Sequence, residues 1–91
     1  MLLFIEPAGL TPSELSQFCM AACEKGKVAA VFSGDDASGY KYAYGSVQTD
    51  IRPLGKALNG ALNGRGGGSE ALVQGGVRAD AAAIRAYFAS L

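Results

Sequence analysis

Five glycines and one arginine lie close together between residues 60 and 68, where the chain reads Gly-Ala-Leu-Asn-Gly-Arg-Gly-Gly-Gly. The run Gly66, Gly67 and Gly68 leaves backbone N–H groups without side chains in front of them, and such a run can form a concave site for an anion. Arg65 adds a planar guanidinium group that fits a phosphate or the edge of a base. We therefore expect a loop at residues 63–68 that binds phosphate or nucleic acid. The same composition also fits a plain connection that turns the chain sharply.

Two further basic residues precede this segment on an expected helix. Lys56 and Arg52 lie about one and two helical turns before its end, so they are candidates for the same phosphate-binding site. Known nucleotide motifs do not fit. A P-loop needs Gly-Lys-Ser/Thr after four spacers, and the dinucleotide fingerprint needs a strand, then glycines, then a helix. Here the expected order is helix, glycines, strand.

Two other groups of residues could bind ligands. Tyr40, Tyr42 and Tyr44 alternate along an expected strand, where they form either a platform on which bases stack or a strand face packed against a helix. Asp35 and Asp36 could hold a metal ion, although paired acids in a Ser/Gly turn are usually solvated. Both alternatives remain open for the tyrosines, whereas solvated turn residues are expected at Asp35 and Asp36.

The sequence contains no credible catalytic pair and no metal site. It has no histidine, and its two cysteines, Cys19 and Cys23, lie four residues apart on one face of an expected helix. This spacing predicts two buried thiols in a reducing compartment, because zinc would need more Cys or His ligands. We therefore expect no catalytic residues, no metal and no cofactor in this chain.

The elements that position these residues can be assigned from caps and periodicity. A strand over residues 2–5 precedes Thr11-Pro12-Ser13-Glu14, a capping box that predicts a helix ending at Gly26. Residues 28–32 read as a buried strand and residues 40–47 as its antiparallel partner, joined by a Ser/Gly/Asp turn. A second helix is expected to start at Asp50, with Pro53 in its first turn.

After the glycine run, residues 71–74 predict a strand that Gly75-Gly76 breaks, and Asp80 predicts the start of a last helix. The order is β-α-β-β-α-β-α. Its strand–helix–strand connections predict an α/β fold with one mixed sheet of about four strands and three helices packed on it. We expect residues 1–91 to form one domain, without a linker or repeat.

Charge is uneven along a chain whose formal net charge is zero. Residues 1–50 carry three lysines against six acids, whereas residues 51–91 carry five basic residues against two acids. A basic half can guide one edge of a phosphate backbone, although scatter of surface charge gives the same counts. No apolar run is long enough to span a membrane, and the N-terminal residues do not read as a signal peptide. We expect a cytoplasmic protein with no membrane partner.

The segment from Asn63 to Gly76 resembles the signature of the DHH-associated C-terminal domain, which closes alanyl-tRNA synthetases, alanyl-tRNA editing proteins and many DHH phosphoesterases. The signature is a glycine run with a basic residue inside it, followed by a strand that carries Gln and Gly. Residues 32–36, 40–43 and 52–59 also resemble the editing-protein version. The resemblance covers essentially the whole chain.

The resemblance implies contact with nucleic acid, and with tRNA in the synthetase and editing branches. Residues that match the family signature are Arg65, Gly66, Gly67, Gly68, Gln74 and Gly75. It also implies that the chain is a C-terminal part of a longer protein, whose upstream editing domain would hold zinc and deacylate mischarged tRNA. The leading hypothesis is a tRNA-binding accessory domain that is not itself an enzyme. The alternatives are the substrate-binding half of a DHH phosphoesterase and a homodimerisation module.

Overall fold

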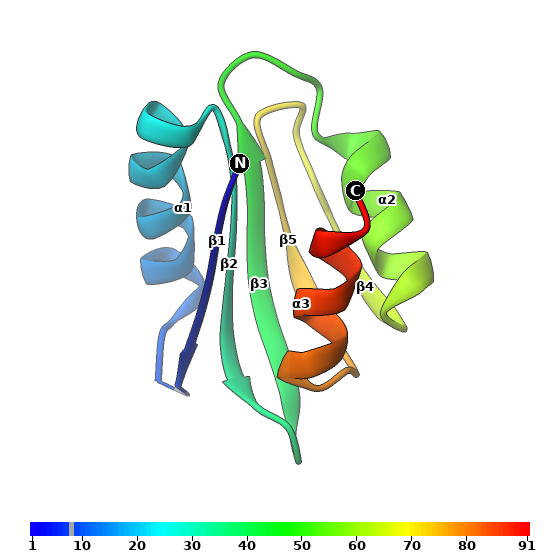
Figure 1. Ribbon diagram of the computed structural model, residues 1–91. Coiled ribbons are helices and arrows are strands. Elements are labelled where there is room, and N and C mark those ends of the chain that lie inside the picture. Colours follow the sequence, from blue (N-terminus) through cyan, green and yellow to red (C-terminus); the bar gives the residue numbers. More distant parts are fainter. Residues whose placement is uncertain (8) are drawn as a thin grey trace.

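A computed structural model describes residues 1–7 and 9–91, in which five strands form one mixed sheet and three helices pack on it (Figure 1). The elements are, in chain order, β1 (Leu2–Pro7), α1 (Pro12–Gly26), β2 (Val28–Asp35), β3 (Gly39–Ser46), α2 (Arg52–Ala61), β4 (Gly64–Gly68), β5 (Leu72–Val77) and α3 (Ala81–Ala89). The strands lie side by side in the order β1-β2-β3-β5-β4. Only the β1–β2 pair is parallel within this sheet. The predicted α/β class is confirmed, with five strands where four were expected.

Local signals place the starts of two helices. The Thr11 side chain accepts a hydrogen bond from the Glu14 N–H, and the Glu14 carboxylate accepts one from the Thr11 N–H, which is the predicted capping box. Asp80 caps α3 by accepting a hydrogen bond from the Ala83 N–H. At α2 the cap position is Ile51, one residue later than expected, while Asp50 accepts a hydrogen bond from the Arg52 N–H. The start of α2 differs from the prediction by one residue only, because the Asp50 carboxylate still accepts a hydrogen bond from a backbone N–H of the first turn.

One face of the sheet packs against α2 and α3 and holds the larger part of the core. The alternation of β3 directs Tyr40, Tyr42 and Tyr44 to this face, where all three are buried. The Phe88 ring of α3 lies edge-on to Tyr44, with ring centroids 5.5 Å apart. Buried rings cannot stack on bases, so the structure supports the packed strand face and not the stacking platform.

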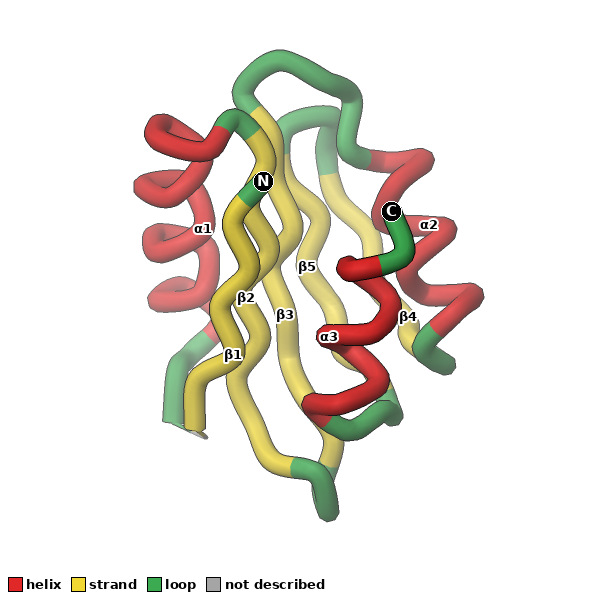
Figure 2. The backbone as a smooth tube through the Cα atoms, viewed as in Figure 1, coloured by secondary structure: helices red, strands yellow, loops and turns green. Residues whose placement is uncertain are grey.

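The other face packs against α1 over β1, β2 and β3. Cys19 and Cys23 are completely buried there against Ala29, Val31 and Ala43 of the sheet. The Cys19 thiol donates a hydrogen bond to the Ala29 carbonyl oxygen. The prediction of two buried, unlinked thiols is confirmed. Figure 2 shows α1 alone on its side of the sheet, with α2 and α3 on the other.

The glycine run is a strand, so the predicted loop at residues 63–68 is wrong. Gly64–Gly68 forms the edge strand β4, which pairs in antiparallel register with β5. Likewise, β5 continues through Gly75 and Gly76, where the sequence suggested a break. Glycines carry no side-chain alternation from which a strand could be predicted, and the ladder with β5 supplies the hydrogen bonds that hold this one extended.

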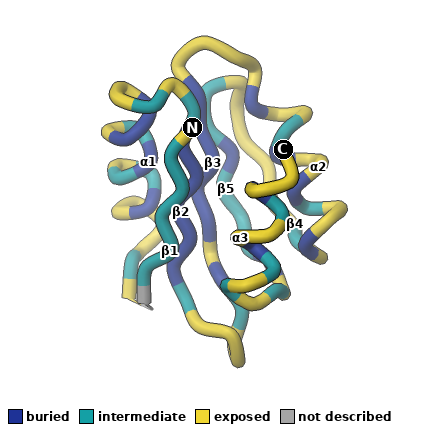
Figure 3. Tube along the Cα trace, viewed as in Figure 1, coloured by how far each residue is buried: buried dark blue, intermediate teal, exposed yellow. Residues whose placement is uncertain are grey.

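The close approach of α2 to the sheet explains the glycines at Gly64 of β4 and Gly55 of α2. A Cβ atom on Gly64 would lie 2.8 Å from Val77 Cγ1 and 2.7 Å from the side-chain oxygen of Asn59 on α2. On Gly55 of α2 it would lie 3.0 Å from Val73 Cγ1 of β5. Small residues on both elements therefore let helix and strand pack close together. The glycine edge remains exposed on its outer side (Figure 3).

Candidate functional site

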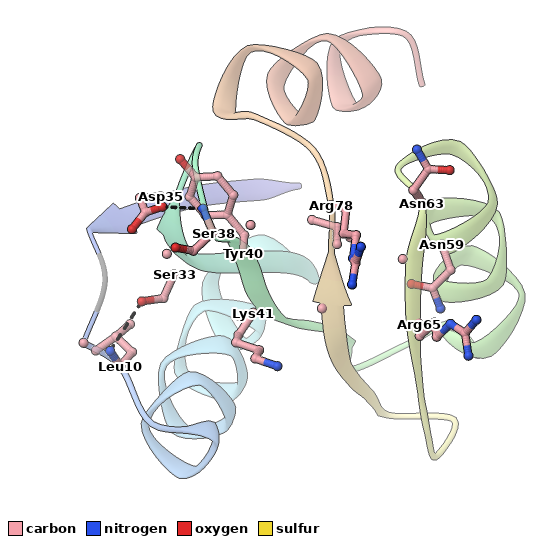
Figure 4. A pocket seen from close by; sticks show the side chains of 16 residues that line it. Leu10, Ser33, Asp35, Ser38, Tyr40, Lys41, Asn59, Asn63, Arg65 and Arg78 are labelled. Atoms are coloured by element: carbon pink, nitrogen blue, oxygen red, sulfur yellow. Dashed lines mark hydrogen bonds between the residues drawn. The ribbon is translucent and has the colours of Figure 1, made fainter.

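An open groove of about 1160 Å³ lies at the end of the sheet where the β2–β3 turn, the start of β4 and the end of β5 meet. Three basic side chains, Lys41, Arg65 and Arg78, belong to its lining, one from each of β3, β4 and the segment after β5 (Figure 4). All three are exposed to solvent. Asp35 is the acidic residue of the lining, so the groove carries a net positive charge.

The strand register places Lys41 and Arg65 on the same face of the sheet. Both residues pair with Gly76 of β5, Lys41 from one side and Arg65 from the other. Since neighbouring strands are about 4.8 Å apart, the two Cα atoms are roughly 10 Å apart across a residue without a side chain. This is the face that α1 covers over β1, β2 and β3, and Arg65 and Gly67 lie exposed beyond that helix.

None of these three cations forms an ion pair with another described residue. In the part of the chain that the structure describes, the single ion pair joins Arg52 to Asp50, with 2.7 Å between nitrogen and oxygen. Lys41, Arg65 and Arg78 therefore present uncompensated charge to the solvent, which is the electrostatic requirement for binding an anion such as phosphate.

The structure brings together part of the predicted site. A second hollow, which shares Lys41, Arg65 and Gly76 with the groove, is also lined by Gln74 and Gly75. The Gln74 amide donates a hydrogen bond to the Pro12 carbonyl oxygen, with a nitrogen–oxygen distance of 2.8 Å, and so ties β5 to the start of α1. Gly67 shares the Arg65 face, and a Cβ atom there would meet nothing within 4 Å.

The other predicted glycines lie differently. Gly66 and Gly68 alternate to the face that α2 covers, and their side-chain directions are blocked by the backbone of β5. Both residues are nevertheless exposed, so the accessible atoms are backbone atoms at the edge of the sheet. The expected concave anion site is not formed, because Gly66, Gly67 and Gly68 are extended and hydrogen-bonded to β5, and none of these three residues has a positive φ.

Lys56 and Arg52 are not in the lining of the groove, and their assignment to the same site as Arg65 remains a prediction. Both are exposed on α2, which packs on the opposite face of the sheet from Arg65. Arg52 begins that helix, seven residues before Asn59, or about 10 Å along the helix axis. Arg52 is the more distant of the two, whereas Lys56 lies three residues, or about 4.5 Å along the axis, before the groove residue Asn59.

Sequence reasoning missed Lys41 and Arg78 as site residues. The alternation of β3 already placed Lys41 opposite the three tyrosines, which was a usable signal. The sequence does not show that β5 lies between β3 and β4. This strand order is the reason why Lys41 and Arg65 flank the same residue, Gly76.

The two aspartates of the β2–β3 turn have structural partners. Asp35 accepts a hydrogen bond from the Ser38 N–H, and Asp36 accepts one from the Ala81 N–H and one from the Tyr40 hydroxyl. These bonds to Ala81 and Tyr40 lower the pKa of Asp36 and so favour its carboxylate form. Among the described residues no cluster of three metal-ligating side chains occurs. The turn therefore joins the β2–β3 hairpin to the start of α3.

The Cys19 thiol does not have the character of a nucleophile. Burial, reinforced by the neighbouring Cys23, raises the pKa of Cys19 to about 12. A thiol of this kind is protonated at neutral pH, whereas a nucleophilic cysteine needs a depressed pKa and access to solvent.

Comparison with solved structures gives a neighbour of the same fold. The chain superposes on the C-Ala domain from Aquifex aeolicus alanyl-tRNA synthetase with a TM-score of 0.69 and 20% sequence identity, over 94% of this chain and 86% of that domain. No protein-family model matches the chain, and no curated protein matches it. None of the described helices has the length and hydropathy of a membrane span.

Proposed function

We propose, from this shared fold and from the charge of the groove, that the chain is an accessory domain that binds tRNA. The C-Ala domain that shares this fold belongs to an enzyme that acts on tRNA, as its name states. The observation that carries the proposal is the open groove with Lys41, Arg65 and Arg78, none of which has an acidic partner within ion-pair distance among the described residues. Phosphate groups of RNA are the polyanion that such a surface fits best.

The shape of the surface supports the same conclusion. Arg65 and Lys41 flank Gly76, and Gly67 leaves its side of the sheet flat and empty. A flat surface allows a phosphate backbone to approach the strands and reach both cations. The chain has zero net charge, so binding depends on this local arrangement and not on overall attraction.

The direct test is a titration of the chain with tRNA for alanine, a non-cognate tRNA and a short single-stranded RNA at two salt concentrations. We expect salt-sensitive binding to tRNA, and we expect Arg65→Ala to reduce the slope of log K against log salt by about one unit. Arg52→Ala is the control, because it removes the same type of side chain from the start of α2, outside the lining of the groove. A slope lowered equally by both variants, or by neither, would contradict the assignment of the groove.

The parent protein is the second part of the proposal. We place the chain in an alanyl-tRNA editing protein, beside a separate zinc-dependent deacylase domain, and assign no catalytic step to the chain itself. The protonated character of Cys19 and the absence of histidine from the sequence support this division. A preference for the short single strand over tRNA would favour a DHH phosphoesterase parent instead.

The free edge of β4 favours self-association as a second candidate function. In the antiparallel ladder, hydrogen bonds at Asn63–Arg78 and Ser69–Leu72 fix the alternation, so the backbone groups of Gly64, Gly66 and Gly68 point outward from the sheet. Such an edge can pair with a second copy of itself. A mass that rises with concentration, measured by sedimentation, would support this function, and a constant monomer mass would exclude it.

A further inference from the structure

Asn59, in the last turn of α2, lies in the lining of the groove and is held by a buried residue of the sheet. The Tyr42 hydroxyl donates a hydrogen bond to the Asn59 side-chain oxygen, with 2.7 Å between the two oxygens. Tyr42 is only 1% exposed, so its ring has no freedom to follow a mobile partner. The bond joins β3 to α2 over the strand that lies between β3 and β4.

Two of the glycines in β4 make room for this bond. A Cβ atom on Gly64 would lie 2.7 Å from the Asn59 side-chain oxygen, and one on Gly66 would lie 2.8 Å from the Tyr42 hydroxyl oxygen. Any larger residue at either position would displace one of the two bonded atoms. The glycines at these positions of β4 therefore leave the space that the Tyr42–Asn59 hydrogen bond needs, in addition to letting α2 pack closely.

The direction of the bond determines what Asn59 can offer to a ligand. Burial raises the pKa of Tyr42, which keeps its hydroxyl protonated and able to donate. The Asn59 oxygen is therefore occupied, whereas its NH2 group has no partner among the residues that the structure describes. An amide in this state presents two free donors, and its oxygen keeps one further lone pair.

We propose that Asn59, positioned by Tyr42, donates its side-chain NH2 group to a phosphate oxygen of the RNA backbone in the groove that Arg65 also lines. This inference rests on the proposed tRNA binding. Bidentate reading of adenine by asparagine needs its oxygen and its nitrogen together, and the Tyr42 hydroxyl already lies 2.7 Å from that oxygen on the buried side. The contact is consequently blind to base sequence, and it adds a neutral hydrogen bond beside the cations of the groove.

The experiment compares Asn59→Ala, Asn59→Asp, Tyr42→Phe and Arg65→Ala in titrations with an oligouridine RNA and with an abasic oligonucleotide of the same length. Asn59→Asp keeps an acceptor for Tyr42 but removes the donors, so it tests the donor without removing the Tyr42 bond. We expect Asn59→Ala to weaken binding about tenfold, as for a lost hydrogen bond to a charged group, and Asn59→Asp to weaken it further. Tyr42→Phe frees the amide and is expected to weaken binding about threefold.

Two readouts separate recognition from a merely structural role. Asn59→Ala and Tyr42→Phe should leave the slope of log K against log salt unchanged, because neither removes a charge, whereas Arg65→Ala lowers it by about one unit. In nuclear magnetic resonance spectra, the Asn59 side-chain NH2 signals should shift on addition of either oligonucleotide. Equal losses with the abasic and the uridine strand are expected for a phosphate contact.

Three outcomes would overturn one proposal or both. If Arg65→Ala weakens binding while Asn59→Ala and Asn59→Asp bind as the unmodified chain does, the role of Asn59 is refuted and the proposed function stands. A loss confined to the uridine strand refutes the phosphate contact. If the unmodified chain binds neither oligonucleotide nor tRNA, both proposals are refuted together.

Discussion

Adding one methyl group to adjacent glycines of β4 is expected to change stability in opposite directions. At Gly66 the new Cβ atom would lie 2.8 Å from Gly75 Cα and from the Tyr42 hydroxyl oxygen, and it would also meet the carbonyl oxygen of Gln74. None of these atoms can move freely, because β5 is paired on both sides and Tyr42 is buried. At Gly67 the same atom would meet nothing within 4 Å.

The magnitudes follow from packing and from the unfolded chain. Overpacking of this kind costs about 1–3 kcal/mol, so Gly66→Ala should lower Tm by roughly 4–20 °C for a domain of this size. Gly67→Ala reduces the freedom of the unfolded chain without a clash, which should stabilise the fold by about 0.4–1 kcal/mol.

Thermal and urea unfolding followed by circular dichroism would measure the difference. Each variant serves as the control for the other, because both carry the same substitution in the same strand. Equal Tm values for Gly66→Ala and Gly67→Ala would refute the close packing of β4 against β5 and Tyr42, and would favour a flexible glycine loop.

Two further predictions concern titration and thiol chemistry. Because the folded pKa of Asp36 lies below its ordinary value of 3.8, the carboxylate contributes stability that is fully present above that value and is lost as the pH falls through the folded pKa. Asp36→Asn should therefore show a smaller loss of stability between about pH 5 and pH 2 than the unmodified chain, and parallel curves would contradict the bonds to Ala81 and Tyr40. Since Cys19 is buried with a pKa of about 12, a thiol reagent at pH 8 should modify it only after unfolding, and rapid labelling of the native chain would show an opening that the structure does not contain.

Features with a local cause could be predicted from the sequence. The capping box at Thr11 depends on two side chains three residues apart, and the burial of Cys19 and Cys23 depends on helical spacing alone. The face of Tyr40, Tyr42 and Tyr44 follows from alternation along one strand. These elements could be predicted because residues close in sequence determine them.

Features that depend on distant partners could not be predicted. β4 is a strand because β5 pairs with it, and glycines alone carry no sign of that partner. Lys41 and Arg65 are 24 positions apart in the chain, and only the insertion of β5 between their strands makes them neighbours in one groove. Lys56 is nearer to Arg65 in sequence, yet α2 carries it to the opposite face.

The groove is assembled from separate stretches of the chain, including the β2–β3 turn, the α2–β4 junction and the end of β5. Unfolded chains do not contain it, so any ligand of the groove binds the native state alone and raises the free energy of unfolding. Thermodynamic linkage puts this increase at about 2.7 kcal/mol when the ligand is present at a hundred times its Kd. A rise in melting temperature across a panel of RNAs and nucleotides would therefore rank ligands of this groove without labels.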